Sequence, residues 1–190
     1  MQCQQAMLWQ QDSPLIVTMF FLHDFTINVS DGCSIVAQAF AANSHFVVKY
    51  GFLRLNGDNV WQASWKGDDP VHRGVNIFTI DTAACTLLES RNFDTYGDRS
   101  AAGQLRDYIN ELSVGTVLVG ISTDEPTSRL SEARSTLSLL GADVSDVGFR
   151  GAFAFVVEKG DPSETVLDKE RTQSSSLARD PAITAFFAGA

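Results

Sequence analysis

The pattern of apolar and polar positions predicts a chain of β-strands with two helices in its second half. Residues 45–50 and 52–55 are strand-like, and 60–65 is the next strand, after the hairpin sequence Asn56-Gly57-Asp58. Residues 75–80 are almost continuously apolar, as in a strand that is covered on both faces. Further strands are expected at 87–93, at 116–121 and, as the last strand, at 153–157.

Two segments have the spacing of amphipathic helices. The first has apolar residues at i, i+3, i+4 and i+7, and Asp98 or Ser100 can cap it. The second begins near Pro126, and Gly141 ends it in the left-handed conformation. The residues expected to face the core are Leu105, Tyr108, Ile109 and Leu112 in the first helix and Leu130, Ala133, Leu137 and Leu140 in the second.

The length of 190 residues suits a single domain. Residues 1–44 are apolar and predict a strand-rich N-terminal extension. Residues 161–190 are expected to form a mobile C-terminal tail. Within that tail, 161–180 is polar and Ser-rich, which favours disorder, whereas 181–190 is apolar and can dock on the body.

Charge and hydropathy narrow the classes of function. The 14 basic and 23 acidic side chains give a net charge of −9, which disfavours a nucleic-acid binder that tracks phosphates. The longest apolar run, residues 15–22, is shorter than the ~20 residues that a membrane span needs. Residues 1–12 lack the basic start of a signal peptide, so we expect either a cytosolic protein or a chain without its signal peptide.

The three cysteines, Cys3, Cys33 and Cys85, cannot all pair within one chain. In a reducing compartment all three would be thiols, and in an oxidising one we expect one internal disulfide. Cys85 lies in a hairpin turn, where it is either a neutral exposed residue or the link of an interchain disulfide. In the second case Cys3 and Cys33 pair internally. The chain has no CxxC or His-Cys cluster, so no metal site is expected.

Motifs that support catalysis are absent from the sequence. Neither a glycine-rich phosphate-binding pattern nor GxSxG occurs. Asp81 ends a buried strand, but position 83 is alanine where a phosphohydrolase would have its second carboxylate. The three histidines are scattered along the chain. We therefore expect a non-enzyme that uses no cofactor.

Five separated motifs nevertheless follow an order that points to a known family. They are Arg73-Gly74-Val75-Asn76, Phe93-Asp94-Thr95-Tyr96, Asp124-Glu125, Gly148-Phe149-Arg150 and Ala154-Phe155-Val156. In their order and their residues they resemble the interleukin-like EMT inducer domain, also called the GG domain. This domain occurs in FAM3 cytokine-like proteins, in hyaluronidase-type proteins and in the stem of the glycosyltransferase that adds N-acetylglucosamine to O-mannose. The resemblance covers about residues 45–160.

The resemblance implies an α+β fold with two packed, mainly antiparallel sheets and short flanking helices. In the glycosyltransferase stem the domain binds N-acetylglucosamine through two arginines and an aspartate, which match Arg73, Asp124 and Arg150 here. The sequence departs from the family at 149–153, where Phe-Arg-Gly-Ala-Phe replaces Trp-Arg-Asp-x-Trp. Arginine donors and carboxylate acceptors can hold sugar hydroxyls and an acetamide. The alternative is that Asp124 forms an ion pair with one of the arginines and only fixes the loops.

The function expected from the resemblance is that of a secreted, homo-oligomeric lectin for glycans with N-acetylglucosamine, without membrane insertion. The runner-up is a FAM3-like secreted signalling protein that acts through a protein receptor. Trp61 and Trp65 lie on one face of a predicted strand, where they belong either to the core or to a sugar-stacking platform.

Overall fold

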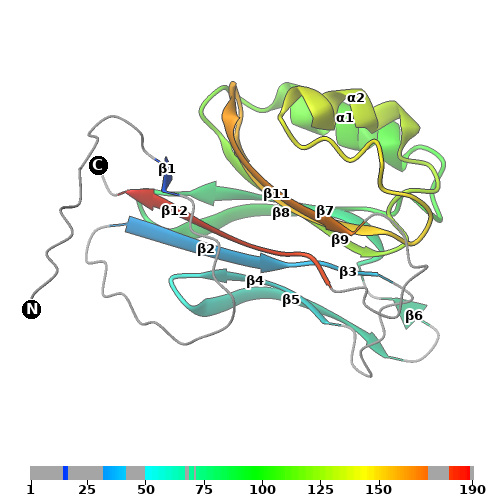
Figure 1. Ribbon diagram of the computed structural model, residues 1–190, viewed down its shortest axis with the longest axis horizontal. Helices are drawn as coiled ribbons and strands as arrows, with labels where there is room; N and C mark the ends of the chain where they lie inside the picture. Colours follow the sequence, from blue (N-terminus) through cyan, green and yellow to red (C-terminus); the bar gives the residue numbers. More distant parts are fainter. Residues whose placement is uncertain are drawn as a thin grey trace, which may run out of the picture.

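Two β-sheets and a pair of helices pack as three layers (Figure 1). The computed structural model describes residues 15–16, 32–41, 50–66, 69–70, 72–170 and 180–188. Sheet A runs in the order β1 (Leu15–Ile16), β12 (Ala182–Ala188), β2 (Gly32–Gln38), β4 (Tyr50–Leu55), β5 (Asp58–Lys66) and β6 (Asp69–Pro70). Sheet B runs in the order β11 (Asp161–Glu170), β10 (Ala152–Glu158), β9 (Val117–Asp124), β7 (Gly74–Asp81) and β8 (Thr86–Phe93).

Nearly all strand pairs in the described residues are antiparallel, and the short strand β3 (Phe40–Ala41), which pairs parallel with the end of β9, is the exception. The helices α1 (Ala101–Glu111) and α2 (Ser131–Leu139) cover one face of sheet B, and sheet A covers its other face (Figure 1). The predicted α+β class, with two packed antiparallel sheets and short helices, is therefore confirmed.

The burial patterns explain why sheet B is the central layer. Along β9 every residue is buried, and along β7 all but the last are, because side chains on both faces of these strands meet a core. In β2 buried residues alternate with partly exposed ones, as in a strand with one solvent-facing side. One core lies between sheet B and the helices, and the second lies between the sheets.

The local sequence signals mark real turns and helix ends. Asn56 and Gly57 both have positive φ, 48° and 90°, as the hairpin between β4 and β5 requires. Gly141 follows α2 with a φ of 86°, as predicted for its end. Of the helix residues expected to face the core, Leu105, Tyr108, Ile109, Leu130, Ala133, Leu137 and Leu140 are buried and Leu112 is partly buried against them.

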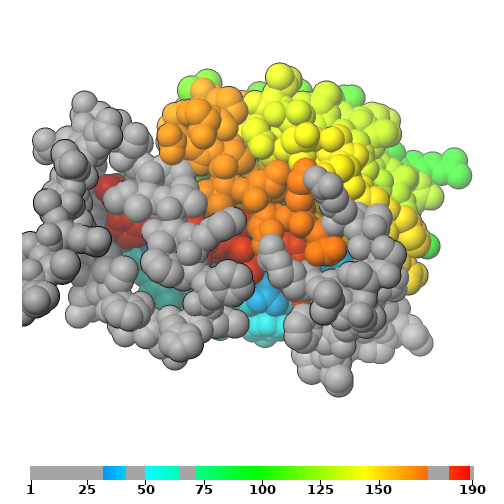
Figure 2. All heavy atoms as spheres, in the orientation of Figure 1, coloured from blue at the N-terminus to red at the C-terminus, as the bar shows by residue number. Residues whose placement is uncertain are grey.

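Residues 161–170, which belong to the segment expected to be disordered, form the strand β11. β11 pairs along its length with β10, and Val166 and Leu167 pack against opposite cores. β11 is an edge strand of largely polar composition, exposed at its first three residues and partly buried along the rest, and this composition resembles that of a disordered segment. It lies at the surface beside β12 (orange and red in Figure 2). The strand expected to be the last, at 153–157, is thus followed by two more.

The apolar end of the chain docks on the body, as expected. β12 lies between β1 and β2 in sheet A, with Ile183, Ala185 and Phe187 buried. Residues 171–179 lie outside the described part of the chain. The same holds for most of the predicted N-terminal extension, although its residues 32–41 form β2 and β3.

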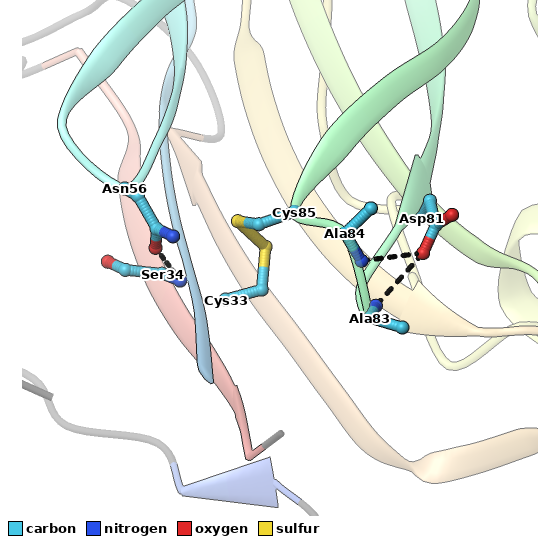
Figure 3. Close-up of a disulfide and its surroundings, with 7 residues drawn as sticks. All are labelled: Cys33, Ser34, Asn56, Asp81, Ala83, Ala84 and Cys85. Carbon is cyan, nitrogen blue, oxygen red and sulfur yellow. Dashed lines mark hydrogen bonds between the residues drawn. A yellow bond between two sulfur atoms is a disulfide. The ribbon is translucent and has the colours of Figure 1, made fainter. Parts of the chain in front are cut away.

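Cys33 and Cys85 form a disulfide within the chain (Figure 3). The interchain bond expected at Cys85, and the pairing of Cys33 with Cys3, are therefore wrong; Cys3 itself lies outside the described residues. Cys85 does sit in the β7–β8 turn, but this turn packs against sheet A, which brings it to the start of β2. The bond joins the two sheets, and the Asp81 carboxylate fixes the turn by accepting the N–H groups of Ala83 and Ala84 at 3.0 and 2.9 Å.

Candidate functional site

Four loops meet at one end of sheet B, opposite the β7–β8 turn. They are residues 72–73 before β7, 94–98 after β8, 125–130 after β9, whose last residue is Asp124, and 148–151 before β10. Because β7 and β10 both run antiparallel to β9, the starts of these two strands lie beside the end of β9. This arrangement brings the segments of Arg73, Asp124 and Arg150 to the same end of the sheet.

Arg73 is held by the turn that follows β8. Its Nε and Nη2 donate to Oδ1 and Oδ2 of Asp94 at 2.9 and 2.6 Å, a two-pronged ion pair. Its guanidinium also lies 4.7 Å from the centre of the Tyr96 ring. The next residue must be glycine, because Gly74 has a φ of 100° and a Cβ there would lie 2.1 Å from the carbonyl oxygen of Phe93.

Asp124 ends β9 in a left-handed conformation, with a φ of 60° and 7% of its surface exposed. The register pairs Gly74 with Thr123, so one further step places Arg73 opposite Asp124. The hydrogen bonds to Asp94 raise the pKa of Arg73, burial lowers it, and the charges of Asp94 and Asp124 raise it again. Arg73 therefore lies in the field of two carboxylates.

Arg150 reaches the site from the other side of β9. Its backbone is also left-handed, with a φ of 57°, and its N–H donates to Oε2 of Glu125. Its guanidinium lies 5.3 Å from the centre of the Phe149 ring. The three predicted residues thus lie around the end of β9. The ion-pair partner that holds Arg73 is Asp94, a residue of the second family motif for which the sequence indicated no role.

The two candidate aromatic residues, Trp61 and Trp65, lie in sheet A. Trp61 on β5 is partly buried and meets the Phe78 ring edge-on, with centres 5.0 Å apart. Its ring also lies 5.7 Å from that of His72, the residue before Arg73. Trp61 therefore packs between the sheets, close to one flank of the site. The side chain of Trp65 lies outside what the structure describes.

Two other aromatic residues are exposed directly at the site. Tyr96 is 43% and Phe149 60% exposed, and each ring is contacted by one of the two candidate arginines. Sequence reasoning missed them as platforms because a single aromatic residue in a loop has no periodic pattern that shows its exposure. Their positions, two residues after Asp94 and one residue before Arg150, were the available signal.

Within the described residues, no group of three or more His, Cys, Asp or Glu side chains is placed to hold a metal ion. Among the same residues, no helix is long and apolar enough to cross a membrane.

The Arg73–Asp94 pair predicts a dependence of stability on pH. Burial raises the pKa of Asp94, but hydrogen bonds from Arg73 and from the Gly97 N–H outweigh it, so the carboxyl titrates below its usual range. Its contribution to stability is then complete above the unfolded-state pKa of about 3.9 and is lost as the pH falls through the lower folded-state value.

We therefore expect Asp94→Asn to be less stable than the wild type at neutral pH and equally stable at strongly acid pH. Urea denaturation of both proteins from pH 7 down to about pH 2.5 measures the difference. A difference that stays constant over this range would show that the charge of Asp94 has no part in it.

Comparison with known proteins adds an independent line of information. Residues 73–161 match the family model described as interleukin-like EMT inducer. The chain is 32% identical over 114 residues to the cell migration-inducing and hyaluronan-binding protein of Homo sapiens, which covers 59% of this chain and 8% of that protein. It is 32% identical over 111 residues to protein FAM3A of Mus musculus, covering 56% of this chain and 46% of that protein. For protein FAM3C of Bos taurus the identity is 30% over 105 residues, with 54% and 44% covered.

The chain thus spans less than half the length of each of these relatives. The matched segment begins at Arg73 and contains the loops of the site except residue 72. It also includes sheet B from β7 to β10 and both helices. The chain therefore contains, over residues 73–161, a domain like the interleukin-like EMT inducer domain, with similarity to FAM3-type proteins.

Proposed function

We propose that this protein is a non-catalytic carbohydrate-binding protein that recognises N-acetylglucosamine-type sugars at the end of β9. The observation that carries the proposal is the grouping of Arg73, Asp124 and Arg150 on adjoining loops, with Tyr96 and Phe149 exposed beside them. Loops on a rigid sheet commonly carry binding residues, and here the sheet is buried on both faces.

The side chains at the site suit an uncharged, hydroxyl-rich ligand. Guanidinium groups are hydrogen-bond donors only and carboxylates are acceptors only, so together they can bind hydroxyls and an acetamide group. The two arginines stand among three carboxylates, Asp94, Asp124 and Glu125, so the site has no excess of positive charge for an anion. Exposed aromatic rings offer an apolar surface to one face of a sugar ring.

An extracellular location belongs to the same proposal. The disulfide between Cys33 and Cys85 is of the kind that persists in oxidising compartments. One of the similar proteins is named for binding hyaluronan, a polysaccharide, although this chain covers only 8% of it. A single shallow site binds weakly, so we propose a homo-oligomer for avidity. Such an oligomer would not be joined through Cys85, which is already paired.

The second candidate is a FAM3-like secreted signalling protein that binds a protein receptor. It is favoured by the larger share of the FAM3 relatives that the chain covers, 46% and 44%. A glycan array separates the two proposals. The lectin proposal expects binding to glycans with N-acetylglucosamine that free N-acetylglucosamine abolishes, and an array without any bound glycan favours the receptor.

Removal of the Arg150 guanidinium is expected to weaken sugar binding. Arg150→Ala should cost about 1.5–3 kcal/mol of binding free energy, the scale for a charged hydrogen-bonding group, with little loss of fold stability. Titration calorimetry with an N-acetylglucosamine disaccharide measures the change. Arg54→Ala is the matched control, because Arg54 on β4 also lies over an aromatic ring, that of Phe52 at 4.5 Å, away from the site. Equal binding by wild type and Arg150→Ala would rule out this site.

Phe149 is expected to provide the stacking surface. Phe149→Ala should reduce the free energy of binding of the same disaccharide by about 0.5–1.5 kcal/mol, the typical contribution of an aromatic contact. The substitution should leave thermal unfolding unchanged, because the ring is mostly exposed. Leu139→Ala, at another exposed apolar residue, serves as the control. If Phe149→Ala binds normally and Trp61→Ala does not, the stacking surface lies on β5 instead.

A further inference from the structure

Glu125 is a buried carboxylate at the centre of the site that the proposed sugar contacts do not use. Only 2% of its surface is exposed, and it directly follows Asp124. Its Oε1 accepts hydrogen bonds from the N–H and hydroxyl of Thr127, at 2.8 and 2.7 Å, and from the N–H of Ser128 at 2.9 Å. Its Oε2 accepts the N–H of Arg150. Three of these four donors lie in the loop of Glu125, and the fourth lies in the loop before β10.

The carboxylate therefore joins two loops that are separate in the sequence. The Thr127 hydroxyl lies beside it, and its single proton lies between two acceptors: Oε1 of Glu125 and, at 3.0 Å, the carbonyl oxygen of Gly148 in the other loop. On the far side the hydroxyl of Thr95 donates to the carbonyl oxygen of Pro126 at 2.6 Å, which ties in the turn of Asp94. The segment 124–128 is thus the hub of the site, and Glu125 is its contact with Arg150.

Arg150 requires such a contact. Its φ of 57° is unfavourable for a residue with a Cβ, so surrounding interactions must hold this backbone conformation. The Glu125 carboxylate receives the Arg150 N–H in a place where water has little access. A carboxylate suits this place because all four groups that face it are donors.

We propose that Glu125 is a positioning residue, which holds Arg150 in the geometry that binds the sugar. The proposal rests on the proposed function, because its consequence is a change in affinity for N-acetylglucosamine-type sugars. It adds a residue that touches no ligand and acts through the Arg150 backbone.

Glu125→Gln tests the proposal with the smallest change of shape. The amide oxygen of glutamine can keep the bonds to Thr127 and Ser128, but its NH₂ group then faces the Arg150 N–H, donor against donor. Affinity for an N-acetylglucosamine disaccharide should fall by roughly 5- to 100-fold, the effect of leaving one buried polar group unsatisfied. Amide exchange at Arg150 should become faster, while exchange within β9 stays the same.

The matched control is Asp81→Asn. Asp81 also accepts two backbone N–H groups from the residues after it, at the opposite end of β7, so its loss should not change sugar affinity. If Glu125→Gln does not fold, Thr127→Val removes the hydroxyl link between the same two loops and should weaken binding as well.

A double-mutant cycle separates positioning from a general structural role. In an Arg150→Ala background, Glu125→Gln should cause no further loss of affinity, because its effect passes through Arg150. An equal loss in both backgrounds, or unchanged affinity and Arg150 exchange in Glu125→Gln, would overturn the proposal. If the wild type binds no sugar, the proposed function fails, and unchanged Arg150 exchange would then show separately that Glu125 does not hold this loop.

Discussion

Replacing both Cys33 and Cys85 by alanine is expected to lower the free energy of unfolding by about 4 kcal/mol, the value that loop-closure entropy gives for a separation of 52 residues. The bond links β2 of sheet A to the β7–β8 turn of sheet B. Without it, the unfolded chain gains conformational entropy in the segment between Cys33 and Cys85. Urea denaturation of the oxidised wild type and the double variant measures the difference.

Wild type treated with a reductant is the control, and its free energy of unfolding should match that of the double variant within the small cost of losing two thiol groups, one buried at Cys33 and one partly buried at Cys85. On a non-reducing gel, the wild type and Cys85→Ala should show no difference in dimer content, because Cys85 pairs within the chain. Equal unfolding midpoints for oxidised and reduced wild type would contradict the structural role of the bond.

Phe155→Ala is expected to destabilise the fold by about 3–5 kcal/mol, because it leaves a cavity in the core under the helices. Phe155 on β10 is fully buried, and its ring fills the space above Gly120 on β9. The ring packs so closely on Gly120 that a Cβ there would lie 2.1 Å from it. Because glycine has no side chain, position 120 cannot fill the cavity that Phe155→Ala leaves.

Leu88→Ala is the control for Phe155→Ala, since Leu88 is a large apolar residue that is mostly exposed on the edge strand β8. Its substitution should change the free energy of unfolding by less than about 0.5 kcal/mol. Chemical denaturation of both variants provides the comparison. A loss of unfolding free energy below about 1 kcal/mol for Phe155→Ala would show that this side chain contributes little to the stability of the core.

Local signals predicted those parts of the fold that local interactions determine. The stripe of Leu105 and Ile109 identified α1, and the Asn56-Gly57 turn identified the β4–β5 hairpin. β11 was missed because its composition is mostly polar, and its pairing with β10 is not visible in composition. The Cys33–Cys85 bond depends on the packing of one sheet on the other, a long-range property that cysteine counting cannot reach.

The residues of the site show the same difference between what the sequence indicates and what only long-range contacts reveal. The order of the motifs identified Arg73, Asp124 and Arg150, and the topology explains why these residues gather around the end of β9. The partners that hold two of them, Asp94 and Glu125, became evident only from hydrogen bonds across separate loops. A sequence lists such carboxylates but does not show which donors surround them.

The proposed function requires that a sugar binds at the end of β9. Backbone NMR of the full chain, titrated with an N-acetylglucosamine disaccharide to millimolar concentration, tests it most directly, because weak binding at a single site remains visible. We expect saturable shifts at the amides of Arg73, Asp124 and Arg150 and unchanged signals around Cys85 at the opposite end. A titration without shifts at millimolar sugar, or with shifts confined to the Cys85 end, would contradict it.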